Sequence, residues 1–298
     1  MIVVFGSINL DLIFRVPALP LAGQTVASPS LRVEPGGKGA NQALAAARDG
    51  AHVVFAGAVG RDRFAADALR LMRAAGIDLS RVAGVDAATG VASICVDDAG
   101  QNLIAVASGA NLHARAAWVE DELLRPDTTL LLQMEVDPAE TTALIYRAKA
   151  RGARVILNLA PAASLSRSAL ESLDLLIANE DEAAWLASHL GTEPSALRDT
   201  LGCDIAVTLG AQGVRAQSAA GGMTLPAHKV AVVDTTAAGD CFSGVLAAGL
   251  DQGLGLDRSL SRATVAAALC CSRPGTQTSL PVQHEIDEAT RLVVFSSE

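Results

Sequence analysis

Residues 234–244 have the sequence DTTAAGDCFSG, in which Asp234 and Asp240 stand on either side of a turn of small residues. The preceding stretch HKVAVVD (228–234) predicts an extended run, and residues 241–250 predict an apolar helix. The first turn of a helix leaves backbone N–H groups unpaired and carries roughly half a positive charge. The small side chains at 237–239 scarcely cover those groups, so the stretch predicts an anion hole at a helix N-terminus.

The second aspartate of this stretch, Asp240, stands on the first turn of the predicted helix. A carboxylate beside an anion hole can take a proton from an attacking hydroxyl while the N–H groups stabilise charge on the group under attack. A plain capping aspartate is compatible with the same sequence. The spacing of Asp234 and Asp240 alone does not distinguish these two interpretations.

Outward from this turn, short apolar runs alternate with helical patterns, which predicts an α/β fold with a mostly parallel sheet. The predicted strands are 2–6, 52–60, 129–135, 153–161, 174–180 and 204–210, and the predicted helices are 39–49, 63–75, 137–151 and 181–190. Near-continuous apolar strands are typical of a sheet with helices on both faces. Ligands of such sheets bind beyond the carboxyl ends of the strands.

Two stretches, 12–34 and 89–107, interrupt the alternation and predict half-buried antiparallel strands. The second contains Asp-Asp-Ala-Gly at 97–100 between two extended runs, which indicates a hairpin. We expect these stretches to form a small β lid over the active face. No internal repeat or linker divides the chain, so we expect a single catalytic domain over residues 1–298.

Composition restricts the function. The 298 residues carry a formal net charge of −9, and a surface of that sign disfavours nucleic acid and acidic lipid as partners. Five cysteines without a C-x-x-C motif indicate reduced thiols. Charges or glycines interrupt every apolar run before it reaches the ~18 residues of a membrane span, and no cleavage signal opens the chain. We therefore expect a soluble, cytoplasmic protein.

Several common catalytic motifs are absent. The stretch EPGGKGANQ (34–42) is not a P-loop, because Gly39 rather than Ser or Thr follows Lys38. No G-x-G-x-x-G follows the first predicted strand, and neither H-E-x-x-H nor G-x-S-x-G occurs. These absences disfavour Rossmann dehydrogenases, zinc enzymes of the H-E-x-x-H type and serine hydrolases.

Seven short motifs occur in the order found in the ribokinase-like sugar kinases, and the chain resembles that family from residue 2 to about 290. They are GSINLD (6–11), GGKGANQ (36–42), NLAPA (158–162), NEDEA (179–183), TLGAQGV (208–214), DTTAAGD (234–240) and RPGTQTSLP (273–281). The resemblance implies a three-layer α/β domain with a small β lid. It also implies a homodimer that pairs through the lids.

The resemblance implies ATP-dependent phosphorylation of a sugar, with conversion of D-ribose to D-ribose 5-phosphate as the favoured reaction. Asp240 matches the catalytic base, and the anion hole for the transferred phosphoryl group matches Ala237, Ala238 and Gly239. Positions that hold the sugar match Asn9, Asp11, Gly37, Lys38, Gly39, Asn41 and Glu135, together with Asp240. In-line phosphoryl transfer needs positioning and charge neutralisation, which such a site supplies.

The resemblance also implies sites for nucleotide and cations. The nucleotide positions match Asn179, Thr208, Gly210, Gly213, Gly239 and Thr264. Asn179 and Glu182 match a motif that organises Mg²⁺ and phosphate, although the same pair fits a capping box. A monovalent cation, expected to be K⁺, is surrounded in the family by the positions of Asp234, Thr236, Cys270, Arg273, Gly275 and Ser279.

Two residues depart from the family pattern, and two alternative functions remain. Ala237 replaces the first glycine of the commoner motif but keeps its N–H, and Pro274 lies within the cation loop, where carbonyls bind. The nearest alternative function is a kinase of the same fold for another sugar or a nucleoside. A non-catalytic sugar-binding regulator is the other, and the presence of Asp240 argues against it.

Overall fold

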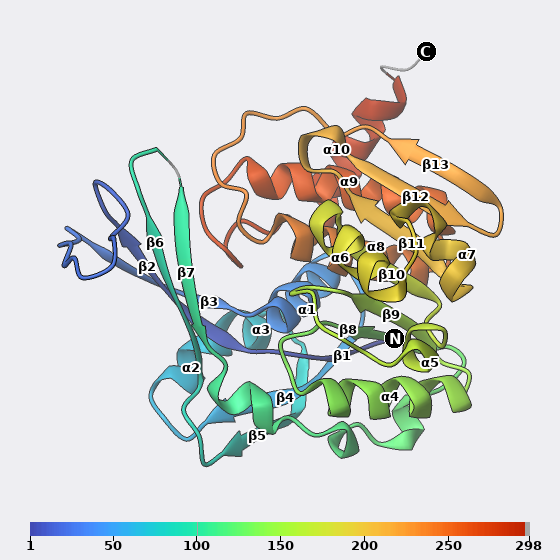
Figure 1. The fold of residues 1–298 in the computed structure, drawn as a ribbon, viewed down its shortest axis with the longest axis horizontal. Helices are drawn as coiled ribbons and strands as arrows, with labels where there is room; N and C mark the ends of the chain where they lie inside the picture. The colour runs from blue at the N-terminus through green and yellow to red at the C-terminus, as the bar shows by residue number, and fades with distance from the viewer. Residues whose placement is uncertain (100, 296–298) are drawn as a thin grey trace.

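A nine-stranded sheet forms the centre of the molecule in this computed structural model, which describes residues 1–99 and 101–295 (Figure 1). The strand order is β13-β12-β11-β10-β9-β8-β1-β4-β5. Neighbours pair in parallel from β11 to β5, whereas β12 and β13 are antiparallel. The strands are β1 Ile2–Phe5, β4 Val53–Gly60, β5 Asp78–Val85, β8 Thr129–Leu132, β9 Arg154–Asn158, β10 Leu175–Asn179, β11 Asp204–Thr208, β12 Val214–Ser218 and β13 Gly221–Leu225.

Helices cover both faces of this sheet and enclose one apolar core on each face. On one side lie α1 Lys38–Arg48, α2 Phe64–Ala68, α3 Arg70–Ala74, α8 Ala238–Asp251, α9 Leu256–Cys271 and α10 Gln283–Phe295. On the other side lie α4 Pro138–Ala150, α5 Arg167–Leu170, α6 Glu180–Leu190 and α7 Leu197–Leu201. Alternate residues of β1 enter the two cores, Ile2 and Val4 on one side and Val3 and Phe5 on the other. The predicted three-layer α/β architecture is confirmed.

A separate four-stranded sheet forms the predicted lid and projects from the body (Figure 1). Its order is β3-β2-β6-β7, with β2 Asn9–Arg15, β3 Leu31–Gly36, β6 Gly90–Val96 and β7 Asn102–Ala107. The expectation of antiparallel strands is wrong for one pair, because β2 and β6 are parallel. Each of these two strands directly follows a strand of the body sheet (β1 and β5), so both leave the body in the same direction.

The hairpin predicted in the lid joins β6 to β7. The carboxylate of Asp97 accepts hydrogen bonds from the N–H groups of Ala99 (3.0 Å) and Gln101 (2.8 Å). This is the local side-chain bonding that favours aspartate in turns. Gly100, the last residue of the predicted turn, lies outside the described residues.

The run before the first aspartate of the opening stretch is not part of a sheet. Residues 226–237 connect β13 to α8 without a strand or helix, and Val232 and Val233 are exposed. The N–H groups of Val233 and Asp234 both donate to the carbonyl of Cys271, at 2.8 and 3.2 Å. The end of α9 therefore positions this run. Within the described residues, no helix is both long and apolar enough to cross a membrane.

Candidate active site

The candidate site lies where the carboxyl ends of the central strands converge. A cavity of about 240 Å³ occupies this position. Asn158 ends β9, Asn179 ends β10 and Thr208 ends β11, and all three line the cavity. The full lining is Lys38, Asn158, Ala160, Ile177, Asn179, Glu182, Thr208, Thr235, Ala237, Ala238, Gly239, Asp240 and Ser243. The fold thus brings together predicted residues from motifs more than 200 positions apart.

The N-terminus of α8 is open toward this cavity. Its N-cap, Ala237, has φ 61° and ψ 5°, and it makes no side-chain capping bond. Among residues 1–99 and 101–295, Ala237 is the only non-glycine residue with positive φ. This left-handed conformation costs roughly 1–2 kcal/mol for an L-residue, so the turn is strained. Space beside Gly239 is open, and the Ala238 N–H makes only a long contact (3.3 Å) to the Thr235 carbonyl.

Asp240, the predicted base, is 7% exposed and is held by two amide donors. Asn41 Nδ2 donates to Oδ2 and Gln42 Nε2 donates to Oδ1, each at 2.9 Å. Both donors lie on the first turns of α1, which packs against α8. The Oδ1 atom of Asn41 is buried and has no hydrogen-bond partner among the described residues. A polar atom of this kind suits a hydroxyl donor on a ligand.

On the lid side, Asp11 projects from β2 beside Gly36. A Cβ added to Gly36 would come within 2.2 Å of the Asp11 carboxylate, so only glycine fits there. Burial, then the nearby carboxylates of Glu135, Glu34 and Asp240, raise the pKa of Asp11 to about 7, although Lys38 opposes the shift. The structure places Asp11, Lys38 and Asp240 in one electrostatic environment.

Lys38 supplies the positive charge of this environment. Burial lowers the pKa of its ammonium group, but Asp240, Glu135, Glu182 and Asp11 together raise the pKa above its ordinary value. The ammonium group of Lys38 therefore lies among these four carboxylates and partly balances their negative charge. Gly37, directly before it, has φ 90° and caps α1. A Cβ on Gly37 would meet the Asn9 nitrogen at 2.7 Å, so the chain segments approach closely here.

The first turn of α1 is held by the end of β8 and the end of β1. Glu135 Oε2 accepts hydrogen bonds from Ser7 Oγ (2.6 Å) and from the Lys38 N–H (3.0 Å). Ser7 Oγ also accepts from the Gly39 N–H at 3.2 Å. Glu135 therefore has a structural role in addition to the predicted one. Ser7 lies inside the motif GSINLD (6–11), but the family resemblance predicts no role for it.

Asn9 is buried at the start of β2 and bonds within the protein. Its Oδ1 atom accepts from Asn111 Nδ2 at 2.7 Å, and Asn111 Oδ1 accepts from the Ile8 N–H at 2.9 Å. This pair joins the chain between the two sheets to the segment after β7. Asn111 has no motif around it, so its part in positioning Asn9 emerges only from the fold.

On the nucleotide side, Asn179 and Glu182 form a capping box at the start of α6. Asn179 Oδ1 accepts from the Glu182 N–H, and Glu182 Oε2 accepts from the Asn179 N–H, both at 2.8 Å. Burial raises the pKa of Glu182, opposed by the Asn179 hydrogen bond and by Lys38. Both side chains also line the cavity, so the capping role and the predicted role are compatible.

The other predicted nucleotide residues are less close to the cavity. Gly210 is the first residue of the 3₁₀ turn η5, Gly210–Gln212, and Gly213 follows it; both have positive φ, 54° and 100°. Thr264 is buried in α9, and its hydroxyl donates to the Leu260 carbonyl at 2.8 Å. Thr264 does not belong to the lining of the cavity described above.

Asp234 joins the turn before α8 to the loop after α9. Its Oδ1 accepts from the N–H and hydroxyl of Thr236, at 2.9 and 2.6 Å, and its Oδ2 accepts from the Gly275 N–H at 3.1 Å. Burial raises the pKa of Asp234, but these hydrogen bonds outweigh it and keep the pKa below its usual value. Cys270 Sγ lies 3.7 Å from the Thr236 carbonyl and 3.1 Å from Ser279 Oγ.

The same loop is tied to the lid by contacts that the sequence analysis does not predict. Glu34 of β3 accepts hydrogen bonds from the Thr276 N–H (3.0 Å) and hydroxyl (3.3 Å). The Thr276 hydroxyl also donates to the Pro35 carbonyl at 2.8 Å. A chain of contacts therefore runs from the lid to the turn that precedes the anion hole.

The comparisons with known proteins agree with this geometry. Residues 1–283 match the model of the pfkB family carbohydrate kinases, and the chain belongs to that family. Similar members are ribokinases: the chain is 34% identical to the Haemophilus influenzae ribokinase over 95% of both chains. The ribokinase structure from Thermotoga maritima superposes with a TM-score of 0.90 at 32% identity, covering 97% of this chain and 99% of that one.

A further neighbour is the Arabidopsis thaliana ribokinase complexed with ribose and ATP. It has a TM-score of 0.86 and 28% identity, and the match covers 97% of this chain and 98% of that one. The predicted membership of the ribokinase-like sugar kinases is confirmed, and with it the prediction of an ATP-dependent sugar kinase.

Proposed function

We propose that this chain transfers the γ-phosphoryl group of ATP to the terminal hydroxyl of D-ribose, giving D-ribose 5-phosphate and ADP. The observation that carries the proposal is the position of Asp240. It is bonded to Asn41 on the sugar side and lines the cavity into which the N-terminus of α8 opens. A base and an anion hole that meet at one point are what in-line phosphoryl transfer needs.

In the proposed reaction, the oxygen of the sugar hydroxyl bonds to the γ-phosphorus of ATP while Asp240 accepts the proton of that hydroxyl. The bond between that phosphorus and the β–γ bridging oxygen breaks, and ADP leaves with the electron pair. The open N–H groups at the start of α8 stabilise charge on the transferred group, as in an oxyanion hole. Lys38, which lines the same cavity, adds a positive charge.

The experiment is a substrate screen. Release of ADP is measured with D-ribose, 2-deoxy-D-ribose, other pentoses, hexoses and nucleosides, each with ATP and Mg²⁺. We expect the highest kcat/KM with D-ribose. A higher kcat/KM with a nucleoside or another sugar would favour the alternative kinase. Sugar binding by calorimetry without ADP release from any acceptor would instead indicate the non-catalytic regulator.

Magnesium fits the nucleotide side of the site, where it would be held by Asn179, Glu182 and the phosphates. One carboxylate and one amide are too few for an all-protein cage, and Mg²⁺ commonly retains water and binds through substrate phosphates. No cluster of three or more His, Cys, Asp or Glu residues suited to a metal occurs in the described part of the chain. When bound, Mg²⁺ would neutralise charge on the phosphates.

A monovalent cation fits the junction between the turn before α8 and the loop after α9. The proposed ligands are hard oxygens, which suit K⁺, and Asp234 already bonds to both segments through Thr236 and Gly275. We expect K⁺ to raise the initial rate more than Na⁺ does, because it orders the turn at 235–237. Asp234→Ala should lose that response, whereas Thr236→Val keeps the carbonyl and should retain it. A flat response of the unaltered enzyme to K⁺ would exclude the cation site.

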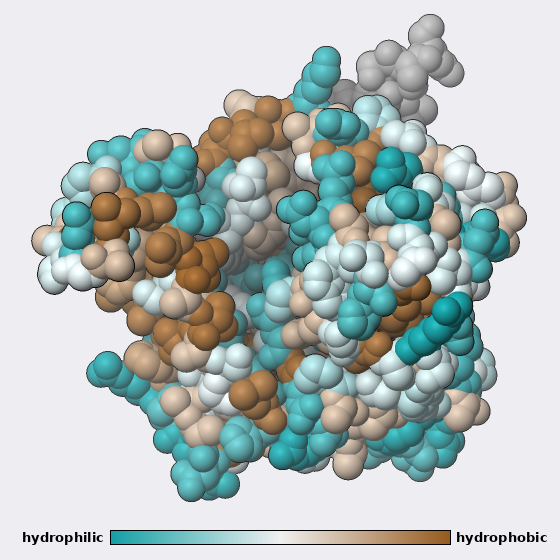
Figure 2. All heavy atoms as spheres, in the orientation of Figure 1, coloured by the Kyte–Doolittle hydropathy of each residue, from teal (hydrophilic) through white to brown (hydrophobic). Residues whose placement is uncertain are grey.

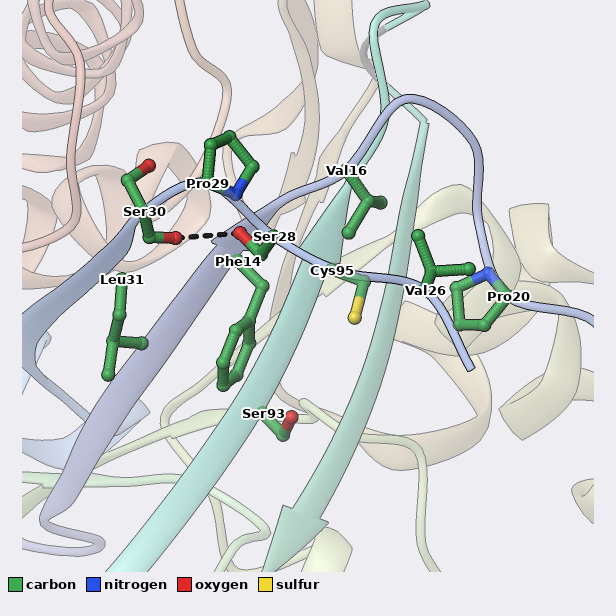
Figure 3. Close-up of a pocket in the computed structure, with 10 residues that line it drawn as sticks. All are labelled: Phe14, Val16, Pro20, Val26, Ser28, Pro29, Ser30, Leu31, Ser93 and Cys95. Carbon is green, nitrogen blue, oxygen red and sulfur yellow. Dashed lines mark hydrogen bonds between the residues drawn. The ribbon is translucent and has the colours of Figure 1, made fainter. Parts of the chain in front are cut away.

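The lid is the proposed dimer interface. Leu31, Phe14, Cys95 and Leu103 lie directly opposite one another across β3, β2, β6 and β7, so they share one face. Leu31 and Leu103 are 51% and 46% exposed, and apolar side chains gather over the lid in Figure 2. Three of the four also line a cavity of about 540 Å³ under the loop 16–30 (Figure 3). Exposed apolar patches mark interaction surfaces.

Cytoplasmic localisation is the remaining part of the proposal. All five cysteines are free in the structure, as expected of a protein in a reducing compartment. ATP as phosphoryl donor agrees with the same location.

A further inference from the structure

The catalytic carboxylate is connected to a chain of buried side-chain amides. Gln133 Nε2 donates to Gln42 Oε1 at 2.7 Å. Gln42 Nε2 donates both to Asp240 Oδ1 and to Asn158 Oδ1, each at 2.9 Å. Both glutamines are fully buried, and Asn158 and Asp240 are each 7% exposed. The chain begins at the end of β8, passes through α1 and ends at the base.

The hydrogen-bonding capacity of an amide gives this chain a direction. A glutamine side chain offers two N–H donors on one side and an acceptor oxygen on the other. With its oxygen bonded to Gln133, Gln42 directs both protons toward Asp240 and Asn158. The reverse orientation would place the amide oxygen against the carboxylate and would face the Gln133 donor with another donor. The Asp240 carboxylate, which only accepts, favours the orientation in which Gln42 is a donor to the base, and the Gln133 donor satisfies the Gln42 oxygen in that orientation.

The side chain of Gln133 destabilises the fold through one unpaired atom, which is consistent with a role in holding Gln42. Its Oε1 atom is buried without a hydrogen-bond partner among the described residues. It lies against Gly6, where an added Cβ would come within 2.1 Å of it. An unsatisfied buried acceptor destabilises the folded state, so stability alone does not account for a glutamine in this position.

We propose that Gln42, held by Gln133, is a positioning residue that fixes the plane of the Asp240 carboxylate. The inference rests on the proposed function, because it assumes that Asp240 is the base. Through Asn158, the same amide ties the base to the wall of the phosphate cavity.

The test is a double-mutant cycle on kcat. Gln42→Met keeps the length of the side chain but removes its donors. We expect kcat to fall about 10- to 100-fold, less than removal of a general base, with the KM values for sugar and ATP within about threefold. Gln133→Met should lower kcat less. Because Gln133 acts through Gln42, the double variant should equal Gln42→Met alone instead of showing the product of both losses.

Two controls separate this role from a general loss of packing. Thr128→Val removes a buried hydroxyl that, like the amide oxygen of Gln133, has no hydrogen-bond partner among the described residues. Thr128 lies directly before β8, at the opposite end of that strand from Gln133, so this variant should leave kcat unchanged. In the Asp240→Asn background, Gln42→Met should cause no further loss of kcat. Near-normal kcat in Asp240→Asn itself would instead refute the proposed function.

The proposal is overturned if folded Gln42→Met retains kcat within threefold of the unaltered enzyme, or if the losses in the double variant multiply. If Gln42→Met does not fold, Gln133→Met decides the matter, since it leaves α1 unchanged. Unaltered kcat in that variant would show that the direction of the amide chain does not affect the base.

Discussion

Each carboxylate oxygen of Asp240 accepts a hydrogen bond from a different amide side chain, Oδ2 from Asn41 and Oδ1 from Gln42. Asp240 is also the only carboxylate on the first turn of α8. Asp240→Asn keeps the size of the side chain but cannot accept the proton. Removing a general base costs on the order of 10²- to 10⁴-fold in rate, so we expect kcat to fall by that factor while sugar binding changes much less. Steady-state kinetics with calorimetry of sugar binding tests this. A kcat near that of the unaltered enzyme would remove Asp240 from the chemistry.

Asp11 gives a prediction for stability at different pH values. Its pKa is raised from 3.8 to about 7 in the folded state, chiefly by burial. The folded state therefore binds the proton more tightly than the unfolded state, and stability decreases as pH rises between these two values. A shift of this size corresponds to at most about 4 kcal/mol at 1.4 kcal/mol per pKa unit. Asp11→Asn removes this penalty.

We expect Asp11→Asn to melt at a higher temperature than the unaltered protein at pH 8, and the difference to shrink or disappear at pH 4. The same variant should have a raised KM for the sugar and a nearly unchanged KM for ATP, because Asp11 lies on the lid side. Thermal melts across this pH range provide the measurement. A difference in melting temperature that does not vary with pH would mean that Asp11 is not desolvated as described.

Among the elements, β3 and the loop after α9 are joined through the carboxylate of Glu34 and the backbone carbonyl of Pro35. Glu34 accepts two hydrogen bonds from Thr276, and hydrogen bonds to charged groups contribute about 1.5–3 kcal/mol. Glu34→Ala should therefore lower the free energy of unfolding by about 1–2 kcal/mol and weaken the response to K⁺, because the loop also bonds to Asp234. Arg32→Ala is the matched control. It removes the ion pair with Glu34, in which the Arg32 side chain is 43% exposed, and such a pair contributes at most about 1 kcal/mol. Equal losses of stability in both variants, measured by denaturant unfolding, would contradict the lid-to-loop link.

The elements that the sequence predicts correctly are those with a strong pattern. The central parallel strands are continuous apolar runs, and 2–6 and 174–180 match β1 and β10 within a residue or so at each end. The strands β12 and β13 are not predicted from the sequence, because neither is a continuous apolar run and both lie toward the edge of the sheet, where few of their residues are buried. The elements β5, α9 and α10 are also missing from the prediction, although each packs mainly against an element close to it in sequence, namely β4, α8 and α9.

The candidate site follows the same division. Asp11, Lys38, Asn41 and Asp240 stand in short motifs, so the family resemblance identifies them. Gln133 stands in an apolar strand pattern and has no motif around it. Its contact with Gln42 spans 91 positions, and only the pairing of β8 with β1 brings the two together. Pairs of buried polar residues are recognised once the sheet order is known.

For the whole molecule, the proposed lid interface predicts a change in oligomeric state. Leu31→Ser combined with Leu103→Ser should convert a dimer into a monomer, because both side chains leave the same apolar face. Light scattering after gel filtration measures the mass. The control is Val232→Ser with Val233→Ser, which removes two side chains of comparable exposure outside the lid. A dimer that survives the lid substitutions, or a protein that is monomeric from the start, would exclude this interface.

Only three residues, 6–8, separate the last residue of β1 in the body from the first residue of β2 in the lid. The groups expected to contact the acceptor lie on β2, on the first turns of α1, after β8 and at the start of α8, whereas most of those expected to contact the nucleotide follow β10 and β11. The start of α8 contributes to both sets through Gly239 and Asp240. Substitutions on β2 therefore alter acceptor contacts and leave the nucleotide contacts in place. In a kinase built in this way, the part that binds the phosphoryl donor and the part that selects the acceptor can change separately.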